Sequence, residues 1–545
     1  MKKIKYISLF CLVFVLTTTA CKDDFFELDV PFDSPITDTQ TLDASIAGAY
    51  YNLTGSGGNG ATFENILAFS IAISDEAYFP NEANGDGNVL SFYDRENVTE
   101  SGWLNTVWTS AYGTIGTVNV SLDFIATNPF PGLPTRTELP RMEGELKFIR
   151  AYSYWMLAKA FCPPYEDGGA NSARILPYRI TSPEGLQDAV QGEPATVEEI
   201  YQLIVSDLID AKELLPNDYT EINEDFQELY MHGRANRFSA AALLSRVYFQ
   251  MGQFDKAEVE ADFVIDQNGG RYGLDENPLT TWARTWNETA LTKESLWTYS
   301  IGRTPNVNGM GPGSDWKVPR RYEFYNFFSR FATQAQQAAP LTHNNGSRTL
   351  SVSETLLSQA GWIDGDGNET DAARADKRYQ ELFLRVEAGN DPVFDAINQP
   401  LVWSNRYYRF NGEGGNAGRA TSHPILRTAE VYLTRAIIRF NKGDLQGAAD
   451  DLNAIRERAW DEVEAGVPYT EITTGTITAD MIHTERMIEM AFQGDRSHYL
   501  QALKLNIPNG DRGPGSIPYN DASLYWPIPE REKELNTALQ GQLGN

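Results

Sequence analysis

The sequence predicts a mostly α-helical protein, in which tetratricopeptide-like helical hairpins form a scaffold for a large irregular, loop-rich half. Three observations favour this fold class. Several long segments repeat apolar residues at helical spacing. Two distant segments share one spacing pattern around Gly252 and Gly443. Between them, residues 271–419 are broken by Gly, Pro and Asn and largely lack a regular period. Long loops of this kind inside a compact protein are usually functional.

The N-terminal residues predict a secretory signal over residues 1–20. Three lysines precede an apolar run from Ile7 to Leu16, and a basic start followed by a short apolar segment is typical of such signals. A helix that spans a membrane needs about 20 apolar residues, so this run is too short for one. We therefore expect the segment to be removed from the mature protein.

Cys21 is the predicted lipidation site. The two small residues before Cys21 resemble a bacterial lipobox, whose cleavage exposes the Cys for acylation, although Thr18 stands where Leu is usual. The two aspartates after Lys22 resemble the signal that sends some lipoproteins to the outer face of the outer membrane. We expect residues 21–45 to form a lipidated tether. The alternative is an ordinary signal peptide in which Cys21 is retained by accident.

The charge balance excludes two classes of partner. The chain carries 45 basic and 74 acidic side chains, a net charge of −29. Such a surface repels the phosphates of nucleic acids and of anionic lipids. No segment after the signal approaches transmembrane length. Attachment to the outer membrane is therefore expected through the lipid on Cys21, and no nucleic-acid partner is expected.

Cysteine usage predicts no disulfide. Cys11 leaves with the signal and Cys21 carries the lipid, so Cys162 has no partner within the mature chain. Cys162 ends an apolar helical run and is expected to pack as a small hydrophobic residue.

Residues 46–270 are expected to form a helical scaffold. Long apolar-periodic runs cover Trp108 to Ile125 and Leu146 to Phe161. Thr196 and Glu199 form a capping box, the arrangement in which two side chains satisfy free amides at the start of a helix. The helix that follows should end at Pro216.

The hairpin repeat rests on matching offsets. Each Gly follows an amphipathic segment, Ser239 to Gln250 in one case and Thr428 to Asn441 in the other. Gly can end a helix in the left-handed conformation, and small residues afterwards let the second helix approach the first. Two unrelated hairpins with a common type of turn are the alternative. The matching positions 2, 5, 9 and 12 residues after each Gly are Phe254, Ala257, Ala261, Val264 and Leu445, Ala448, Leu452, Ile455.

The remaining boundaries follow from the same patterns. Residues 420–505 are expected to hold the C-terminal tetratricopeptide-like helices, including a helical run from Met481 to Leu505. Residues 506–545 are expected to pack on the scaffold as a tail.

Six stretches of the chain, taken in order, form a recognisable set. They are EGELKFIRAYSYWMLAKAF (143–161), ATVEEIYQLIVSDLIDAKELLP (195–216), GRANRFSAAALLSRVYFQMGQFDKAE (233–258), TSHPILRTAEVYLTRAIIRFNKGDLQGAADDLNAIRERA (421–459), ERMIEMAFQGDR (485–496) and LYWPIPEREKELN (524–536). In this order they resemble the SusD/RagB family of outer-membrane nutrient-binding lipoproteins, and the resemblance spans nearly the whole mature chain. The chain departs from the family pattern at His423-Pro424, in its EMAFQG stretch and at Asn536-Thr537, positions that look architectural.

The resemblance implies a function in nutrient capture. Similar proteins sit on the cell surface above a TonB-dependent, SusC-type transporter and deliver an oligosaccharide, or in some branches a peptide, to it. It also implies that the helical repeats face the transporter, that the irregular half carries the ligand site, and that no catalysis and no cofactor are involved.

Sugar rings stack on flat aromatic side chains while carboxylates bond their hydroxyls, so aromatic and acidic residues on loops are the candidate ligand residues. Asp75 is the candidate hydroxyl acceptor, and a structural carboxylate is the alternative for it. The candidate aromatics are Trp282, Trp286, Trp316, Tyr322 and Tyr325. Trp362, in the same loop-rich stretch, is a further aromatic candidate. For each of these aromatic residues the alternative is burial in a local core.

The sequence holds one pattern that is similar to a calcium-binding loop. Asp364, Asp366 and Asn368 alternate as in calcium loops, but Glu369 and Ala375 stand where an EF-hand requires Gly and Glu, so a solvated turn is the expectation. No metal-binding spacing, nucleophile elbow or phosphate loop occurs in the sequence. A lipid-anchored glycoside hydrolase stays open because its paired carboxylates are defined only in space, as does a purely structural helical scaffold.

Overall fold

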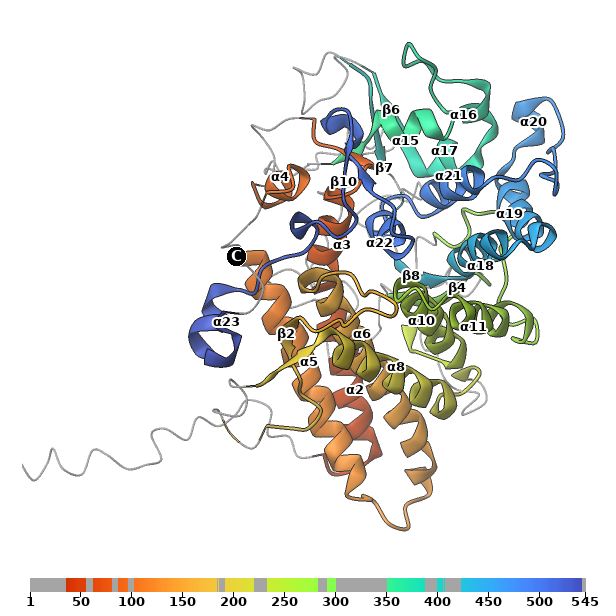
Figure 1. Cartoon of the computed structure of the whole chain (residues 1–545). Helices are drawn as coiled ribbons and strands as arrows, with labels where there is room; N and C mark the ends of the chain where they lie inside the picture. The colour runs from red at the N-terminus through yellow and green to blue at the C-terminus, as the bar shows by residue number, and fades with distance from the viewer. Residues whose placement is uncertain are drawn as a thin grey trace, which may run out of the picture.

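The computed structural model describes residues 36–54, 62–80, 87–96, 102–183, 185, 192–219, 233–282, 292–299, 350–387, 399–404, 406 and 423–541. The predicted mostly α-helical class with irregular segments is confirmed. Among these residues no helix combines the length and apolar character needed to cross a bilayer. Figure 1 traces the chain from the red N-terminal helices to the blue C-terminal segment.

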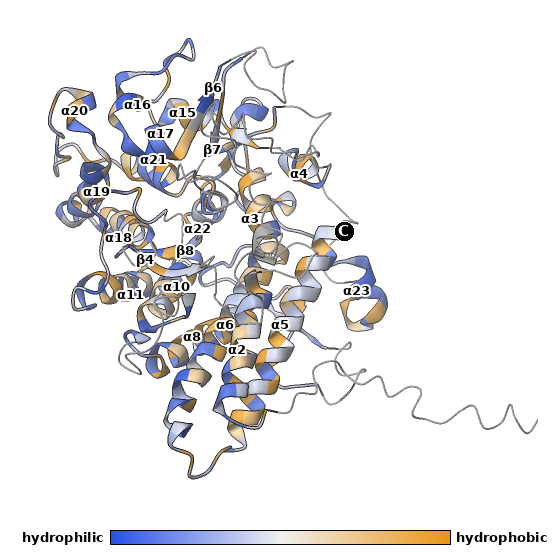
Figure 2. Ribbon diagram, turned by 180° about the vertical axis from the view of Figure 1, so that it is seen from behind, coloured by the Kyte–Doolittle hydropathy of each residue, from blue (hydrophilic) through white to orange (hydrophobic). Residues whose placement is uncertain are grey.

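The N-terminal half forms the helical body. Contacts join α2 to α5, α5 to α6 and α6 to α8, and Figure 1 shows these long helices together at the lower end of the molecule. Orange and blue alternate along α2 and α5 in Figure 2, as expected for helices that bury one face. The elements are α2 (Thr39–Thr54), α3 (Thr62–Ala72), α4 (Gly87–Tyr93), α5 (Gly102–Ala126), η3 (Pro134–Glu138), α6 (Leu139–Phe161), β2 (Arg174–Pro177), β3 (Pro194–Thr196) and α8 (Val197–Leu214).

Two helical hairpins follow the predicted pattern. The first pairs α10 (Arg237–Gln250) with α11 (Phe254–Asp266), and the second pairs α18 (Thr428–Lys442) with α19 (Leu445–Ala459). Gly252 and Gly443 both adopt left-handed conformations, with φ of 75° and 86°. Helix α11 also packs on α18, so the two hairpins are stacked neighbours in space.

Short strands and helices make up the described part of the irregular half. The strands pair antiparallel as β1 (Ala77–Tyr78) with β5 (Ser351–Val352), β4 (Ser295–Tyr299) with β8 (His423–Arg427) and β6 (Phe383–Val386) with β7 (Leu401–Ser404). Strand β8 leads directly into α18, and thus joins the irregular half to the second hairpin. The helices of this part are α15 (Glu354–Gln359), α16 (Asp371–Ala375) and α17 (Lys377–Leu382).

The C-terminal segment returns to the N-terminal helices. Trp526 packs its ring on Phe69, Phe92 and Phe161, and its backbone N–H donates to the Ala160 carbonyl. The elements of this segment are α20 (Glu462–Ala465), α21 (Ala479–Glu489), α22 (Arg496–Ala502), β9 (Ile507–Pro508), η7 (Gly510–Arg512), β10 (Ser516–Ile517), η8 (Ala522–Leu524), α23 (Glu530–Leu535) and η9 (Thr537–Leu539).

Two local predictions are confirmed in detail. Thr196 Oγ1 accepts from the Glu199 N–H, and the Glu199 carboxylate accepts from the Thr196 N–H, which completes the capping box. Cys162 is buried, and burial raises the pKa of its thiol. A buried neutral thiol of this kind packs rather than reacts.

Candidate ligand-binding site

Most of the predicted aromatic residues lie outside the described residues. Trp286, Trp316, Tyr322 and Tyr325 belong to this group, so their role stays a prediction. Residues 300–349, which carry three of them, connect the end of β4 to the residue before β5. The described strands therefore mark where this part of the chain is attached.

Trp282 is buried, which corrects the expectation of an outward ring. The side chain is 1 % exposed, and the guanidinium carbons of Arg406 and Arg427 lie 5.0 and 5.3 Å from its ring centroid. A sugar could reach this ring only by displacing both guanidinium groups. Trp282 is thus buried in a local core, the alternative stated for it above. Trp362 is buried as well and packs on Tyr379.

Asp75 is a structural carboxylate in this fold. It is fully buried, and its two oxygens accept hydrogen bonds from Arg496 Nε and Nη2 at 2.8 and 2.9 Å. Such a bidentate pair uses the carboxylate that a sugar hydroxyl would need. The expectation that Asp75 accepts from a ligand is therefore corrected.

Glu76, next in the chain, is also fully buried. Burial raises the pKa of its carboxyl to about 8. Its Oε2 accepts from the Phe492 N–H at 3.0 Å, and Phe492 has a positive φ of 59°. Asp75 and Glu76 together fix the start of β1 against the turn that precedes α22.

The outer end of β1 carries an aromatic side chain that packs against β7. Tyr78 is partly buried and packs on Leu401 and Trp403 of β7. These three residues, which we call the β1–β7 patch, lie on strands next to the attachment points of the undescribed segments. Trp403 is not among the ligand residues predicted from the sequence. Its only signal was the short apolar run of Leu401 to Trp403.

A buried ion-pair cluster lies at the junction of the irregular half with the second hairpin. Glu489 of α21 accepts from Arg427 Nη1 at 2.7 Å and from Arg378 Nη1 at 2.8 Å, and Arg458 Nη2 lies 3.2 Å from it. Arg427 also donates to Glu294, 2.5 Å away. Burial alone would raise the pKa of Glu489, but these three guanidinium groups and that of Arg406 hold it well below its usual range. The cluster positions β4, β8 and α17 around α21.

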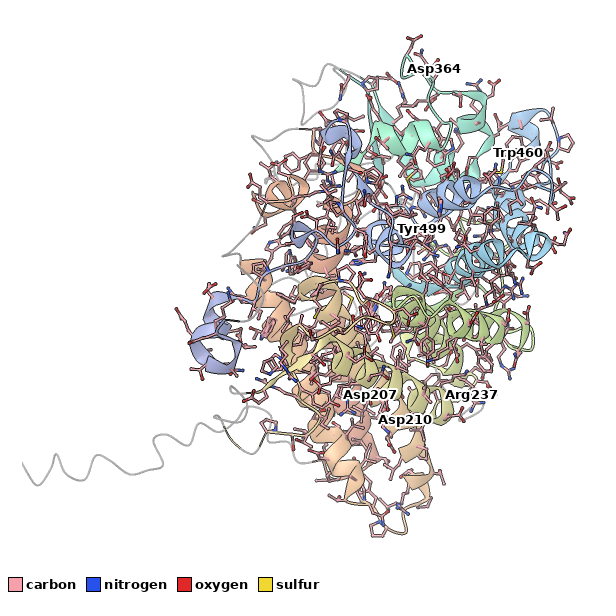
Figure 3. All side chains as sticks on the ribbon, viewed as in Figure 1. Asp207, Asp210, Arg237, Asp364, Trp460 and Tyr499 are labelled. Atoms are coloured by element: carbon pink, nitrogen blue, oxygen red, sulfur yellow. The ribbon has the colours of Figure 1, made fainter. Side chains whose placement is uncertain are left out.

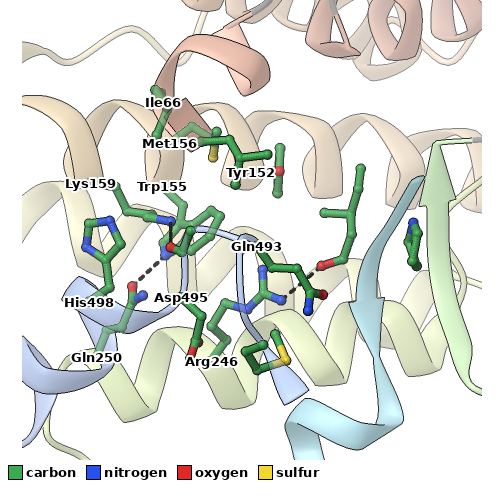
Figure 4. Close-up of a pocket in the computed structure, with 15 residues that line it drawn as sticks. Ile66, Tyr152, Trp155, Met156, Lys159, Arg246, Gln250, Gln493, Asp495 and His498 are labelled. Atoms are coloured by element: carbon green, nitrogen blue, oxygen red, sulfur yellow. Dashed lines mark hydrogen bonds between the residues drawn. The ribbon is translucent and has the colours of Figure 1, made fainter. Parts of the chain in front are cut away.

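A small cavity lies between α6, α10 and the turn before α22 (Figure 4). Trp155 Nε1 donates to Gln250 Oε1 at 2.7 Å on one wall, and Arg246, Lys159 and Asp495 contribute charged groups. The free space is about 40 Å³, enough for a few water-sized occupants. Ligand sites for small molecules usually measure roughly 300–1,000 Å³, so this cavity cannot hold a sugar ring.

A larger hollow lies at the tips of the two hairpins. It measures about 420 Å³ and is lined by Gly252 to Lys256, by Ile438, Asn441 and Lys442, and by Asp167. Its walls combine charged and amide side chains with Phe254 and Ile438. The hollow belongs to the repeat scaffold rather than to the irregular half.

The described residues offer no cluster of metal ligands. No group of three or more His, Cys, Asp or Glu side chains there could hold a metal ion. The predicted turn at Asp364 lies at the tip of the molecule (Figure 3), and its Oδ1 accepts from the N–H groups of Asp366 and Asn368, each at 2.9 Å. Its carboxylate thus stabilises the turn.

Comparison with known proteins identifies the family. A profile described as "Starch-binding associating with outer membrane" matches residues 29–249, and the profile of the SusD family matches residues 253–499. The SusD-like protein P2 of Formosa agariphila is 27 % identical over 459 residues, covering 81 % of this chain and 80 % of the relative.

Solved structures of the family share the fold. A SusD superfamily protein of Bacteroides thetaiotaomicron has a TM-score of 0.69 at 22 % identity, covering 92 % of this chain and 98 % of the other. A SusD-like carbohydrate-binding protein of Bacteroides vulgatus has a TM-score of 0.67 at 16 % identity, with 93 % and 98 % covered. A laminarin-binding SusD-like protein has a TM-score of 0.62 at 20 % identity, with 92 % and 98 % covered. The helical hairpins, the strand-linked irregular half and both profile matches together show that this chain belongs to the SusD/RagB family.

Proposed function

We propose that this protein is a cell-surface lipoprotein that captures an oligosaccharide and passes it to a TonB-dependent, SusC-type transporter. The observation that carries the proposal is family membership over residues 29–249 and 253–499. Related structures of the same fold include a laminarin-binding and a carbohydrate-binding protein. Capture needs no bond to be broken, so the protein acts by binding alone.

The ligand site is proposed on the irregular half, at Tyr78 of the β1–β7 patch and on the undescribed parts of the chain that adjoin these strands in sequence. Leu401 and Trp403 are buried and support the Tyr78 ring from behind. Tyr78 supplies a partly buried ring there, and Trp286, Trp316, Tyr322 and Tyr325 are the proposed stacking residues. Flat rings bind the C–H faces of a pyranose, and polar neighbours orient its hydroxyls. Trp282 and Asp75 support the frame from inside, each held by arginines.

The membrane anchor and the transfer to the transporter rest on other parts of the chain. An acyl chain on Cys21 would hold the protein at the outer membrane, with its body facing outwards. The helical hairpins are proposed to face the transporter, and the hollow of about 420 Å³ at their tips offers a mixed polar and apolar recess for such a partner. Replacing Cys21→Ala should release the protein from membranes, as measured by fractionation.

Calorimetry or affinity electrophoresis against a panel of glycans tests the ligand. We expect one glycan class to bind, and Trp316→Ala, Tyr322→Ala or Tyr325→Ala to weaken that binding. Tyr51→Ala is the matched control, because Tyr51 is a 51 % exposed aromatic residue on α2 of the helical body. Circular dichroism melts should show that all four variants fold.

The same assay separates the alternatives. Binding from a peptide library without binding to any glycan would replace the oligosaccharide by a peptide. Release of reducing sugar from a bound glycan would indicate a hydrolase. If neither ligand class binds and uptake is unchanged in the aromatic variants, the protein is a structural scaffold and the proposal fails.

A further inference from the structure

Lys159 occupies an unusual position for a lysine on the long helix α6. Its side chain lines the cavity of Figure 4, with Nζ 4.6 Å from the centroid of the Trp155 ring and 3.5 Å from the Gly494 carbonyl oxygen. None of the ion pairs between described residues includes Lys159. By contrast, Lys147 on the same helix pairs with Glu143 at 3.1 Å and with Asp210 at 2.7 Å.

The carboxylates near Lys159 are committed to other cations. Glu430 accepts from Arg246 Nε at 2.6 Å and lies 3.7 Å from Arg486. Asp495 accepts from Arg486 Nε and Nη2, both at 2.7 Å. Three cations thus face two carboxylates in this described cluster, which leaves one positive charge without a counterion.

Other titratable groups around the cavity do not restore the balance. His498 is held by Ser70 and Gln501, and burial, together with the charge of Lys159, keeps its pKa well below the usual range. It is therefore neutral. Glu76 has a pKa of about 8 because it is buried, so it is mostly protonated at neutral pH. Asp75 and Arg496 neutralise each other.

A charge that has lost much of its hydration and has no counterion is costly, and a protein can avoid this cost in two ways. The amine can lose its proton, and burial together with Arg246 does lower the pKa of Lys159 to about 7. Alternatively, an anion can supply the missing charge. The free space of about 40 Å³ suits a small ion with a water molecule. Lys159 is only partly buried, so ions can reach it from solvent.

We propose that the cavity at Lys159 binds one small monovalent anion of the halide class. The anion would contact the Lys159 ammonium and share the cavity with Arg246, whose guanidinium carbon lies 5.4 Å from the same Trp155 ring. Asp495 also lines the cavity, but its two oxygens are bonded to Arg486, which reduces its repulsion of an anion. Bound there, the ion would link α6, α10 and the turn before α22.

Bromide provides a direct probe. Crystals of the mature protein grown or soaked in bromide should show an anomalous difference peak in the cavity beside Lys159 Nζ, and chloride should remove it by competition. A cavity that holds only water, or a peak found only at exposed surface lysines, would overturn the proposal.

Thermal unfolding gives an independent readout in solution. At equal ionic strength, sodium chloride should raise the melting temperature of the wild-type protein above its value in sodium gluconate, because an ion that binds only the folded state stabilises it. Lys159→Met should abolish this chloride-specific increase. Lys147→Met is the matched control on the same helix and should retain it.

The two experiments together keep the proposal falsifiable. If Lys159→Met fails to fold, the bromide peak and the chloride-specific increase of the wild-type protein decide the question alone. Equal melting temperatures in chloride and gluconate for the wild-type protein, or an unchanged chloride effect in a folded Lys159→Met variant, would show that no halide binds there. Neither result would affect the proposed capture of an oligosaccharide, which concerns the irregular half.

Discussion

The two helical hairpins share a turn but differ in how their helices are joined. Eight residues before the glycine, α10 carries Leu244 and α18 carries Arg435. Leu244 is 1 % exposed in the apolar core. Arg435 instead donates to both oxygens of Asp451 on α19, at 2.9 and 2.7 Å. The corresponding acid of the first hairpin, Glu260, leaves its own hairpin to pair with Lys212 of α8.

The comparison shows which positions of the hairpin repeat are fixed and which can vary. Both hairpins keep a left-handed Gly and a fully buried Ala, Ala257 or Ala448, where the helices approach each other. The residues that face each other across the hairpin can be apolar or charged. Arg435 also reaches Asp262 and Asp266 of α11. The charged hairpin therefore holds its neighbour as well as itself.

Replacing Arg435→Ala should have the largest effect on this comparison. It leaves Asp451, which is 3 % exposed, without its main partner, and breaking a buried ion pair in this way costs about 3–5 kcal/mol. Urea unfolding should show a lower midpoint. Surface ion pairs typically contribute less than about 1 kcal/mol. A decrease in the free energy of unfolding below this size would mean that the Arg435–Asp451 pair stabilises the fold no more than an exposed ion pair.

Leu244→Ala is the matched change in the first hairpin. Truncating a buried Leu creates a cavity and costs about 2–5 kcal/mol. Because no charge is involved, we expect the loss in free energy of unfolding to be the same at low and high salt. An equally strong salt dependence for Leu244→Ala and Arg435→Ala would contradict the proposed difference between the hairpins.

Acid should weaken the second hairpin through its junction with α21. Arg458 of α19 and Arg427 before α18 both bond Glu489, whose pKa is held well below its usual range. A lowered folded pKa contributes stability above the unfolded value of about 4.3, and this stability is lost as the pH falls below it. The loss should reach roughly 2 kcal/mol, as for other strongly paired carboxylates.

Urea unfolding at a series of pH values checks this expectation. Between neutral pH and strongly acidic pH the wild-type curve should fall more steeply than that of Glu489→Gln, which has no carboxyl to protonate there. Parallel curves would show that other carboxylates determine the acid sensitivity.

Replacing the turn glycines with Ala should give the smallest difference in stability between the two hairpins. An Ala in a left-handed conformation costs about 1–2 kcal/mol. Gly443→Ala meets no atom within 4 Å, whereas a Cβ on Gly252 would lie 3.2 Å from Asp167 Cβ. We therefore expect Gly252→Ala to be the more destabilising of the two by thermal melts, and the reverse order would contradict the crowding at that turn.

The helical scaffold could be predicted because its signals are local. The left-handed glycines, the small residues after them and the capping box of Thr196 and Glu199 all act within one or two helical turns. The pattern that specifies such a feature lies within the feature itself. The pattern located the ends of helices less accurately. Helix α10 begins at Arg237, two residues before the expected Ser239.

The orientation of the candidate ligand residues could not be predicted in the same way. Asp75 is satisfied by Arg496, 421 residues later, and Trp282 is covered by Arg406 and Arg427. An aromatic or acidic residue in an irregular segment has no periodicity that shows which side it faces. Only the distant partner decides, and a single sequence does not identify that partner.

These long-range contacts also set an order of events at the ribosome. Asp75 emerges 421 residues before Arg496, and at about 5–20 residues per second the delay is roughly 20–80 s. The hydrogen bond from Arg95 to Asn509 and the one from Arg512 to the Ala72 carbonyl likewise form only after the C-terminal residues have been synthesised. The segment from Ala72 to Arg95 therefore cannot reach its final packing until synthesis is almost finished, and holdase chaperones have time to act on it.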